Sequence, residues 1–221
     1  EAVGRNVRQF RPGDQVFGIS DFGAFAEYRC VTEDKLELKP ANISFEEAAA
    51  VPTSAVAALQ GIRDTGEIQP GQKVLINGAS GGVGTYAIQI AKYYGAEVTA
   101  VCSTGKIDMV RSIGADHVVD YTKKDFTQNG QHYDLIIGVN GYHSLSDYKR
   151  ALSPEGIYVM IGGTMPQIFQ AMLLGPLMSK KGGKQMRGMG SVKINQEDLV
   201  VMKEILETGK VVPVIDRRYT L

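Results

Sequence analysis

Four glycines lie close together in the segment VLINGASGGVG, at positions 78, 81, 82 and 84. Three of them recur at a spacing of three residues, between an apolar run and a helix-forming run. A single glycine at such a point is typical of any tight turn that needs a positive φ. The repeated set allows a backbone to approach a ligand closely and a helix to pack tightly on its strand. The segment therefore predicts a phosphate-binding turn for a dinucleotide.

The register of this turn departs from the common G-x-G-x-x-G pattern. The six residues that end at Gly84 are Ala-Ser-Gly-Gly-Val-Gly, so Ala79 stands where the first glycine is expected. A strand precedes the turn and a helix follows it, which is the context that the motif requires. The N–H groups and partial positive charge of the first helical turn suit a pyrophosphate.

The chemistry at the cofactor's ribose is suggested by Cys102-Ser103-Thr104, at the end of the next strand. A site that prefers NAD usually carries Asp or Glu about 20 residues after the glycines, to bind the ribose 2′-hydroxyl. No carboxylate stands at this point of the sequence, hydroxyl groups are available to a 2′-phosphate, and Lys106 follows. The sequence therefore predicts NADP(H) rather than NAD(H). The alternative interpretation of Lys106 is a solvated lysine at a helix start.

Strands and helices alternate around the glycine turn. Strands are predicted over residues 73–77, 97–102, 116–121, 133–139 and 156–163, and helices over 82–95, 106–114 and 144–152. The uninterrupted Val74-Leu75-Ile76 is typical of a strand buried on both faces of a parallel sheet. This alternation predicts an α/β fold with a Rossmann-type, doubly wound parallel sheet and right-handed crossovers.

The first part of the chain has a different pattern. Residues 1 to about 40 indicate short strands and turns, including RPGDQVFG and the alternating segment GAFAEYRCV. Ser44 is suited to cap a helix that has Glu46 and Glu47 in its first turn. A proline-interrupted helical stretch then continues to about Arg63.

Composition argues against several classes of partner and of site. The 24 acidic and 24 basic residues argue against nucleic acid or an anionic membrane as the main partner. Cys30 and Cys102 are too few for a disulfide framework or a metal cluster. No apolar run reaches the ~20 residues that span a bilayer. We expect a cytoplasmic protein that contacts neither nucleic acid nor membrane. The start at Glu1 and the end soon after an apolar run suggest an internal piece of a longer protein.

These segments together resemble the medium-chain dehydrogenase/reductase superfamily, in its zinc-free quinone oxidoreductase (zeta-crystallin-like) branch. The resemblance is carried by GDQVFG, GAFAEY, FEEAAAVPTSAVAALQGI, the run from Lys73 to Tyr121 and the closing GKVVPVIDRRYTL. It implies part of a β-rich, GroES-like catalytic domain in residues 1–50 and a dinucleotide-binding domain over 51–190. It also implies that the chain returns to the catalytic domain over 191–221. This catalytic domain would be truncated, because the chain lacks most of the domain's beginning and its extreme C-terminus.

The resemblance further implies which residues meet NADPH. The pyrophosphate would be wrapped by Ser80, Gly81, Gly82, Val83 and Gly84. The adenosine end would lie against Ser103, Thr104 and Lys106 at the 2′-phosphate and Tyr121 at the ribose. The nicotinamide end would lie near Thr53, Asn140, Gly162 and Gly163. Alternatively, Tyr121 simply ends a strand, and Asn140-Gly141 is an ordinary turn pair.

The same resemblance bears on the reaction. Zinc-containing members insert a four-cysteine lobe after GD-x-V, whereas GDQV here leads into GAFAEY without a cysteine. The two cysteines and three histidines lack the spacing of zinc ligands, so we expect no metal. Hydride transfer without a metal favours acceptors that are already electrophilic, such as quinones and α,β-unsaturated carbonyls. No catalytic acid emerges from the residues.

Two other functions stay open, namely a zinc-independent alcohol dehydrogenase or carbonyl reductase of the same superfamily, and a non-catalytic NADPH-binding protein. The methionine-rich segment 164–191 is interpreted as a core-facing helix or as a pocket cover or dimer surface. Family members commonly dimerise by pairing edge strands of their nucleotide domains. The resemblance therefore implies a homodimer here, with KQMRGMG, residues 184–190, as the candidate edge strand.

Overall fold

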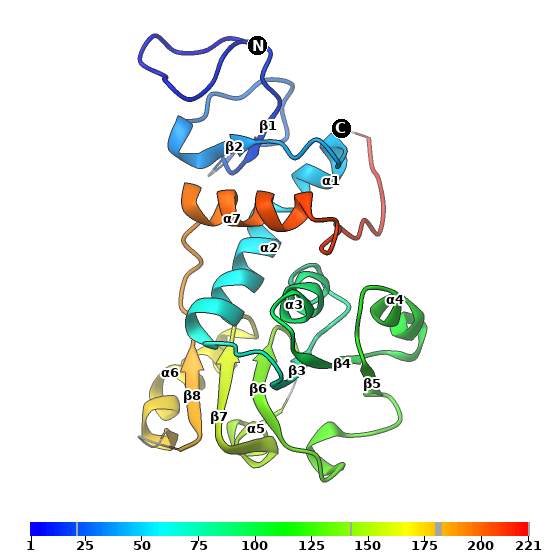
Figure 1. Ribbon diagram of the computed structural model, residues 1–221. Coiled ribbons are helices and arrows are strands. Elements are labelled where there is room, and N and C mark those ends of the chain that lie inside the picture. Colours follow the sequence, from blue (N-terminus) through cyan, green and yellow to red (C-terminus); the bar gives the residue numbers. More distant parts are fainter. Residues whose placement is uncertain (21, 142, 180–182, 221) are drawn as a thin grey trace. The chain divides into compact units, whose positions relative to one another are not determined.

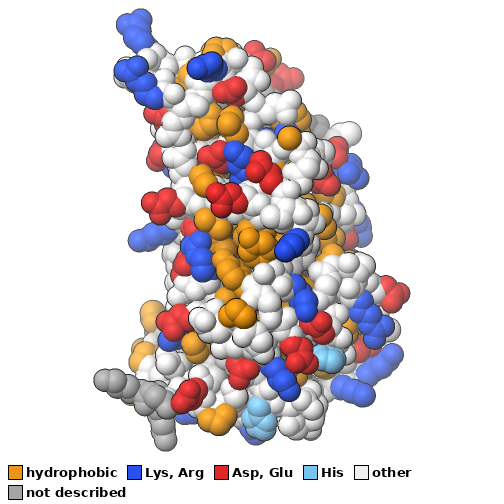
Figure 2. Space-filling model, in the orientation of Figure 1, with side chains coloured by type: hydrophobic (Ala, Val, Ile, Leu, Met, Phe, Trp, Pro, Cys, Tyr) orange, Lys and Arg blue, Asp and Glu red, His pale blue; other side chains and the backbone are white. Residues whose placement is uncertain are grey.

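The computed structural model describes the chain except for residues 21, 142, 180–182 and 221 (Figure 1). The chain divides into two compact units. One unit comprises residues 57–192, and the other comprises residues 1–56 together with 193–221. Basic and acidic side chains are interspersed over the face drawn in Figure 2, in keeping with the balanced charge of the sequence. Among the described residues, no helix is long and apolar enough to cross a membrane.

A six-stranded parallel sheet forms the centre of the unit 57–192, with strand order β5-β4-β3-β6-β7-β8. Its strands are β3 Lys73–Asn77, β4 Glu97–Cys102, β5 His117–Asp120, β6 Tyr133–Gly138, β7 Leu152–Met160 and β8 Gln185–Gly188. The first strand of this sheet, β3, lies in its middle. β4 and β5 extend the sheet to one edge, and β6, β7 and β8 extend it to the other. This order confirms the predicted Rossmann-type, doubly wound α/β fold.

Helices connect these strands, as the alternating pattern predicts. They are α3 Gly82–Tyr93, α4 Ile107–Ser112, α5 Leu145–Ala151 and α6 Met165–Met178, with short 3₁₀ turns η3 Thr104–Lys106 and η4 Phe126–Gln128. The π-helical segment η2 Gln60–Thr65 precedes β3. The side chains of Val74, Leu75 and Ile76 are fully buried between the helical layers. Burial on both faces is the reason for the unbroken apolar run in this strand.

Strand β7 begins four residues earlier than the predicted start at residue 156. Leu152 is extended and buried, and Pro154 follows it within the strand. The pairing register with β6 shifts at this point, between Tyr133 and Leu135. Proline has no N–H for the ladder, so an irregularity of this kind is where a strand can accept it.

The other unit is built from the two ends of the chain. Strand β1 Val16–Gly18 pairs antiparallel with β2 Leu36–Leu38. Its further elements are η1 Glu33–Lys35, α1 Phe45–Ala49, α7 Gln196–Glu207 and the start of α2 Pro52–Leu59. The Lys203 ammonium lies 3.2 Å from the Glu37 carboxylate, and the Asn42 amide donates to the carbonyl of Leu206. These contacts tie α7 to the N-terminal segments.

Two sequence predictions for this unit had different outcomes. Ser44 caps α1 in a capping box with Glu47, as its position predicts. The alternating segment GAFAEYRCV was expected to contribute to short strands, yet its described residues form none. Phe25 is 95% exposed and Tyr28 is 72% exposed. A strand is stable only when a neighbour satisfies its backbone hydrogen bonds, and within the described chain β1 pairs only with β2.

Candidate functional site

The glycine turn lies at the carboxyl end of β3, directly before α3. Gly78 has a φ of +89°, a conformation that strongly favours glycine. A Cβ at this position would lie 2.6 Å from the carbonyl oxygen and 2.8 Å from the backbone nitrogen of Asn140. Gly78 is therefore required both by its own backbone and by the close approach of the turn that follows β6.

Gly84 lies within the first turns of α3, where a Cβ would overlap the backbone of Gly78 and Ala79. The helix is consequently pressed against the turn, which confirms the packing that the repeated glycines predict. Gly81 differs, because a Cβ there would meet only the Gly78 carbonyl oxygen, at 3.6 Å. Its exposed backbone begins α3 without a side-chain cap. An exposed helix N-terminus without a side-chain cap is a type of site that suits an anion.

A cleft of about 520 Å³ lies at the carboxyl ends of the strands. It is lined by residues at or just beyond the ends of β3, β4, β5 and β6, namely Asn77, Gly78, Ser80, Val101, Cys102, Tyr121, Lys124, Asp125, Phe126, Asn140, Gly141 and His143. Strand order reverses at β3, between β4 on one side and β6 on the other. In open α/β sheets, ligands bind at this switch point. The cleft brings together three predicted residues, Ser80, Tyr121 and Asn140.

The predicted 2′-phosphate residues lie along the rim of the same sheet edge. Ser103 precedes η3, which comprises Thr104 to Lys106, and the latter two side chains are exposed. Tyr121 lies beside them, because its N–H donates to the carbonyl of Cys102. Its side chain is 62% exposed and so presents its ring to solvent at the cleft.

A carboxylate lies next to this group, although the sequence around residues 102–106 carries none. Asp120 ends β5 and pairs with Cys102 in the register of the sheet. Its carboxylate accepts hydrogen bonds from the hydroxyls of Thr104, at 2.5 Å, and Thr122, at 2.7 Å. These two bonds lower the pKa of Asp120 to about 2. The sequence at the end of β4 does carry no carboxylate, but β5 brings Asp120 beside it.

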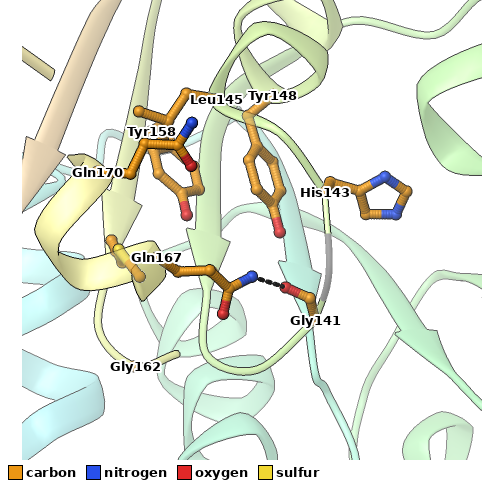
Figure 3. Close-up of a pocket in the computed structure, with 10 residues that line it drawn as sticks. Gly141, His143, Leu145, Tyr148, Tyr158, Gly162, Gln167 and Gln170 are labelled. Atoms are coloured by element: carbon orange, nitrogen blue, oxygen red, sulfur yellow. Dashed lines mark hydrogen bonds between the residues drawn. The ribbon is translucent and has the colours of Figure 1, made fainter. Parts of the chain in front are cut away.

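The predicted residues at the other end of the site follow β6 and β7. Gly162 donates its N–H to the carbonyl of Gly138, at 3.3 Å, and a Cβ there would lie 2.5 Å from the Val139 carbonyl oxygen. Gly163 has a φ of +155° and leads into α6. The Gln167 amide on that helix donates to the Gly141 carbonyl, at 3.2 Å (Figure 3). The turns after β6 and β7 are thus linked.

Thr53 is the one predicted cofactor residue outside the unit 57–192. It lies in α2, and its side chain is exposed.

Three buried residues beneath the site were not predicted from the sequence. Asn77, at the end of β3, donates from its amide nitrogen to the hydroxyl of Tyr148, at 2.8 Å. The Tyr148 and Tyr158 rings are stacked with centroids 4.3 Å apart, and Figure 3 shows both hydroxyls pointing toward the side of Gln167 and Gly141. Burial raises the pKa of both tyrosines. They therefore stay protonated near neutral pH and support the turn after β6. An amide ending an apolar strand was the only signal for this group.

His143 follows β6 and was not proposed as a site residue from the sequence. It lines the cleft and is only partly exposed. Its ring meets the buried Phe126 edge-on, with centroids 4.7 Å apart. The contact joins the turn after β6 to the loop after β5. Over the described part of the chain, no three His, Cys, Asp or Glu side chains are grouped so as to hold a metal ion.

Comparison with known proteins shows similarity along the whole chain. Residues 113–221 match the model of a family described as zinc-binding dehydrogenase. The 2-methylene-furan-3-one reductase of Solanum lycopersicum is 34% identical over 229 residues, which cover 97% of this chain and 53% of that protein. The chloroplastic quinone oxidoreductase QR1 of Triphysaria versicolor is 30% identical over 231 residues, which cover 99% of this chain and 69% of that protein.

A third relative is the chloroplastic NADPH-dependent alkenal/one oxidoreductase of Arabidopsis thaliana, 33% identical, with 97% of this chain and 53% of that protein covered. The chain thus spans about half the length of the tomato and Arabidopsis relatives. Among solved structures, an alcohol dehydrogenase superfamily protein from Novosphingobium aromaticivorans is 30% identical with a TM-score of 0.80, covering 98% of this chain and 69% of that chain.

Proposed function

Because this chain belongs to the medium-chain dehydrogenase/reductase superfamily, we propose that its protein transfers a hydride from NADPH to a quinone or an α,β-unsaturated carbonyl compound. The observation that carries the proposal is the glycine turn at the switch point of the sheet, where Gly78 and Gly84 leave no room for a side chain. The names of relatives that act on alkenals, enones and quinones support the choice of substrate.

The residues around the cleft fit such a cofactor. An uncapped helix N-terminus beside exposed glycines suits the pyrophosphate, and we assign this contact to Ser80, Gly81, Gly82, Val83 and Gly84. We assign Ser103, Thr104 and Lys106 to the 2′-phosphate and Tyr121 to the adenosine ribose. Asn140, Gly162 and Gly163 are assigned to the nicotinamide end, together with Thr53. When bound, NADPH supplies the hydride, and the protein contributes position and electrostatics.

Residues 1–50 and 191–221 are proposed to be parts of the catalytic domain, with residues 51–190 as the nucleotide domain. The two compact units have nearby bounds, at residues 56/57 and 192/193. The family description refers to zinc, whereas the cysteines and histidines of this chain lack the spacing of zinc ligands. We propose a reaction that uses no bound metal. Treatment of the protein with a strong chelator is then expected to leave its turnover unchanged, and loss of turnover that zinc restores would contradict this part.

We further propose that the protein is a homodimer that pairs through its nucleotide domain. Strand β8 lies at an edge of the described sheet, and the neighbouring helix α6 has no charged residue. Seven of its apolar side chains are exposed, namely Met165, Ile168, Phe169, Met172, Leu173, Leu174 and Leu177. An apolar surface of this kind is rarely left in contact with water. A cytoplasmic location stays a prediction, and the relatives include chloroplastic proteins.

Titration of the chain with NADPH and with NADH, followed by cofactor fluorescence, tests the proposal. We expect NADPH to bind more tightly, because Lys106 and Ser103 can donate to a 2′-phosphate. Equal affinities would contradict the assignment of those residues. Turnover of a quinone and an enone by the full-length protein would exclude a non-catalytic role, and reduction of simple ketones alone would favour a carbonyl reductase.

A further inference from the structure

The Asp120 carboxylate, at the rim of the proposed adenosine site, is held by donors from two loops. One carboxylate oxygen accepts a hydrogen bond from the Thr104 hydroxyl, at 2.5 Å. The other oxygen accepts hydrogen bonds from the backbone N–H of Thr122, at 3.0 Å, and from its hydroxyl, at 2.7 Å. The Lys123 ammonium lies 3.5 Å away. Asp120 itself is only 8% exposed, so this arrangement is part of the folded sheet edge rather than a loose surface contact.

These bonds determine what Thr104 can offer to a ligand. An ionised carboxylate only accepts hydrogen bonds, and a hydroxyl carries a single proton. The pKa of Asp120, lowered to about 2 by the two threonines, keeps the carboxylate ionised near neutral pH. The proton of Thr104 is therefore committed to Asp120. The Thr104 oxygen can accept a hydrogen bond from a ribose hydroxyl, but its proton is already used. Of the three residues that we assign to the 2′-phosphate, only Ser103 and Lys106 can therefore donate to it.

The same carboxylate also adds a negative charge beneath the group that we assign to the 2′-phosphate. Lys123 offsets this charge only in part, because its ammonium is solvated and 3.5 Å away. A phosphate dianion is disfavoured by a nearby carboxylate, whereas a neutral 2′-hydroxyl is not. Asp120 thus opposes the attraction of Ser103 and Lys106 for a 2′-phosphate, although it lies 14 positions after Lys106 in the sequence.

We propose that Asp120 limits the preference of this site for NADPH over NADH. The inference rests on the proposed function, and it assigns to Asp120 a role in specificity rather than in catalysis. Asp120 acts through the Thr104 hydroxyl that it orients and through its own charge. The site is then one that accepts both cofactors, with a preference for NADPH smaller than Lys106 alone would produce.

The test is the variant Asp120→Asn, whose side chain has the same shape and can keep a bond to each threonine. We expect the Kd for NADPH to fall by about threefold to tenfold and the Kd for NADH to change little. An unchanged ratio of the two Kd values, or weaker NADPH binding, would overturn the inference.

Asp134→Asn is the matched control. Asp134 accepts hydrogen bonds from the Lys73 N–H and the Ser153 hydroxyl, at the opposite end of the strands from the cleft. The Asp134→Asn variant therefore removes one negative charge, as Asp120→Asn does, but far from the cleft. If this variant tightens NADPH binding as much as Asp120→Asn, the effect is one of net charge and the inference fails.

A second variant keeps the test valid if Asp120→Asn folds poorly. Asp120→Ser removes the same charge with a smaller side chain that can still hydrogen-bond to a neighbouring threonine, and we expect it also to lower the Kd for NADPH relative to the Kd for NADH. A loss of NADPH binding would contradict the inference. If the unchanged chain binds neither cofactor, the proposed function fails and the inference with it, whereas binding with an unaltered preference in the variants rejects the inference alone.

Discussion

Gly84 of α3 lies so close to Gly78 that a methyl group on its Cα would overlap the Gly78 carbonyl oxygen. The same methyl group would lie 2.8 Å from the Cα of Ala79. Both neighbours are backbone atoms of the turn that joins β3 to α3, and this turn also lies against the backbone of Asn140. Moving either atom away would therefore disturb several packed backbone segments. The helix, the turn and the strand therefore form one rigid support for the cleft.

Gly84→Ala is expected to lower the free energy of unfolding by about 1–3 kcal/mol, because an added methyl group overpacks this contact. Urea unfolding followed by circular dichroism measures the effect. Gly105→Ala is the control, because no atom beyond the adjacent residues lies within 4 Å of a Cβ at that position. Equal stability of the two variants would show that the turn can relax and would contradict the rigid support.

Tyr148→Phe removes the hydroxyl that accepts a hydrogen bond from the side-chain amide of Asn77. The buried Asn77 amide then lacks this acceptor. We expect a loss of about 1–3 kcal/mol in the free energy of unfolding. Tyr28→Phe, on a side chain that is 72% exposed, is expected to stay within about 0.5 kcal/mol of the unchanged chain. A neutral result for Tyr148→Phe would mean that the amide finds another acceptor.

Lys106→Ala is expected to raise the Kd for NADPH about tenfold, the effect of losing one charge-assisted bond to a phosphate, and to leave the Kd for NADH nearly unchanged. Fluorescence titration of both cofactors measures the two constants. Lys73→Ala removes the same charge from the amino end of β3 and serves as the control. A parallel loss for both cofactors would mean that Lys106 meets the pyrophosphate or only supports the fold.

The exposed apolar face of α6 predicts the behaviour of the protein in solution. Phe169→Glu combined with Leu177→Glu, at side chains 59% and 81% exposed, is expected to convert a dimer into a monomer in sedimentation velocity. Burial of charged groups in an apolar interface is strongly unfavourable. Val200→Glu on α7 is the control for added negative charge at a partly exposed valine. A dimer that survives the double change would place the interface elsewhere.

The decrease in the free energy of unfolding at acid pH is expected to depend on Asp120, Asp147 and Glu47. Bonds from Thr104 and Thr122 lower the pKa of Asp120 to about 2, and bonds from Ser144 and Ser44 lower the pKa of Asp147 and Glu47. A carboxyl whose pKa falls on folding stabilises the folded state above its ordinary pKa. That stabilisation is lost as the pH falls from about 4.5 toward 2.

Urea unfolding between pH 7 and pH 2 measures this loss. Asp120→Asn is expected to flatten the decline between about pH 4 and pH 2, because the variant has no carboxyl to protonate there. An equally steep decline in the variant would mean that other carboxylates dominate this decrease.

The strands, the helices and the glycine turn could be predicted from the sequence because each depends on residues that are neighbours along the chain. The apolar run of β3, the spacing of Gly78, Gly81 and Gly84, and the cap at Ser44 are local patterns of this kind. The segment GAFAEYRCV shows the limit of such patterns. Its alternation is typical of a strand, but a strand also needs a partner, and no local pattern supplies one.

The sequence by itself thus determined a dinucleotide-type turn on an α/β sheet and the side chains that follow each strand. Only the tertiary structure decided which of these side chains meet. Asp120 reaches Thr104 because β5 lies beside β4 in register, and Tyr148 meets Asn77 across 71 positions of sequence. The physical reason is that local propensity depends on a few adjacent residues. The charge, proton direction and burial at a site depend instead on contacts between strands and helices that are far apart in the chain.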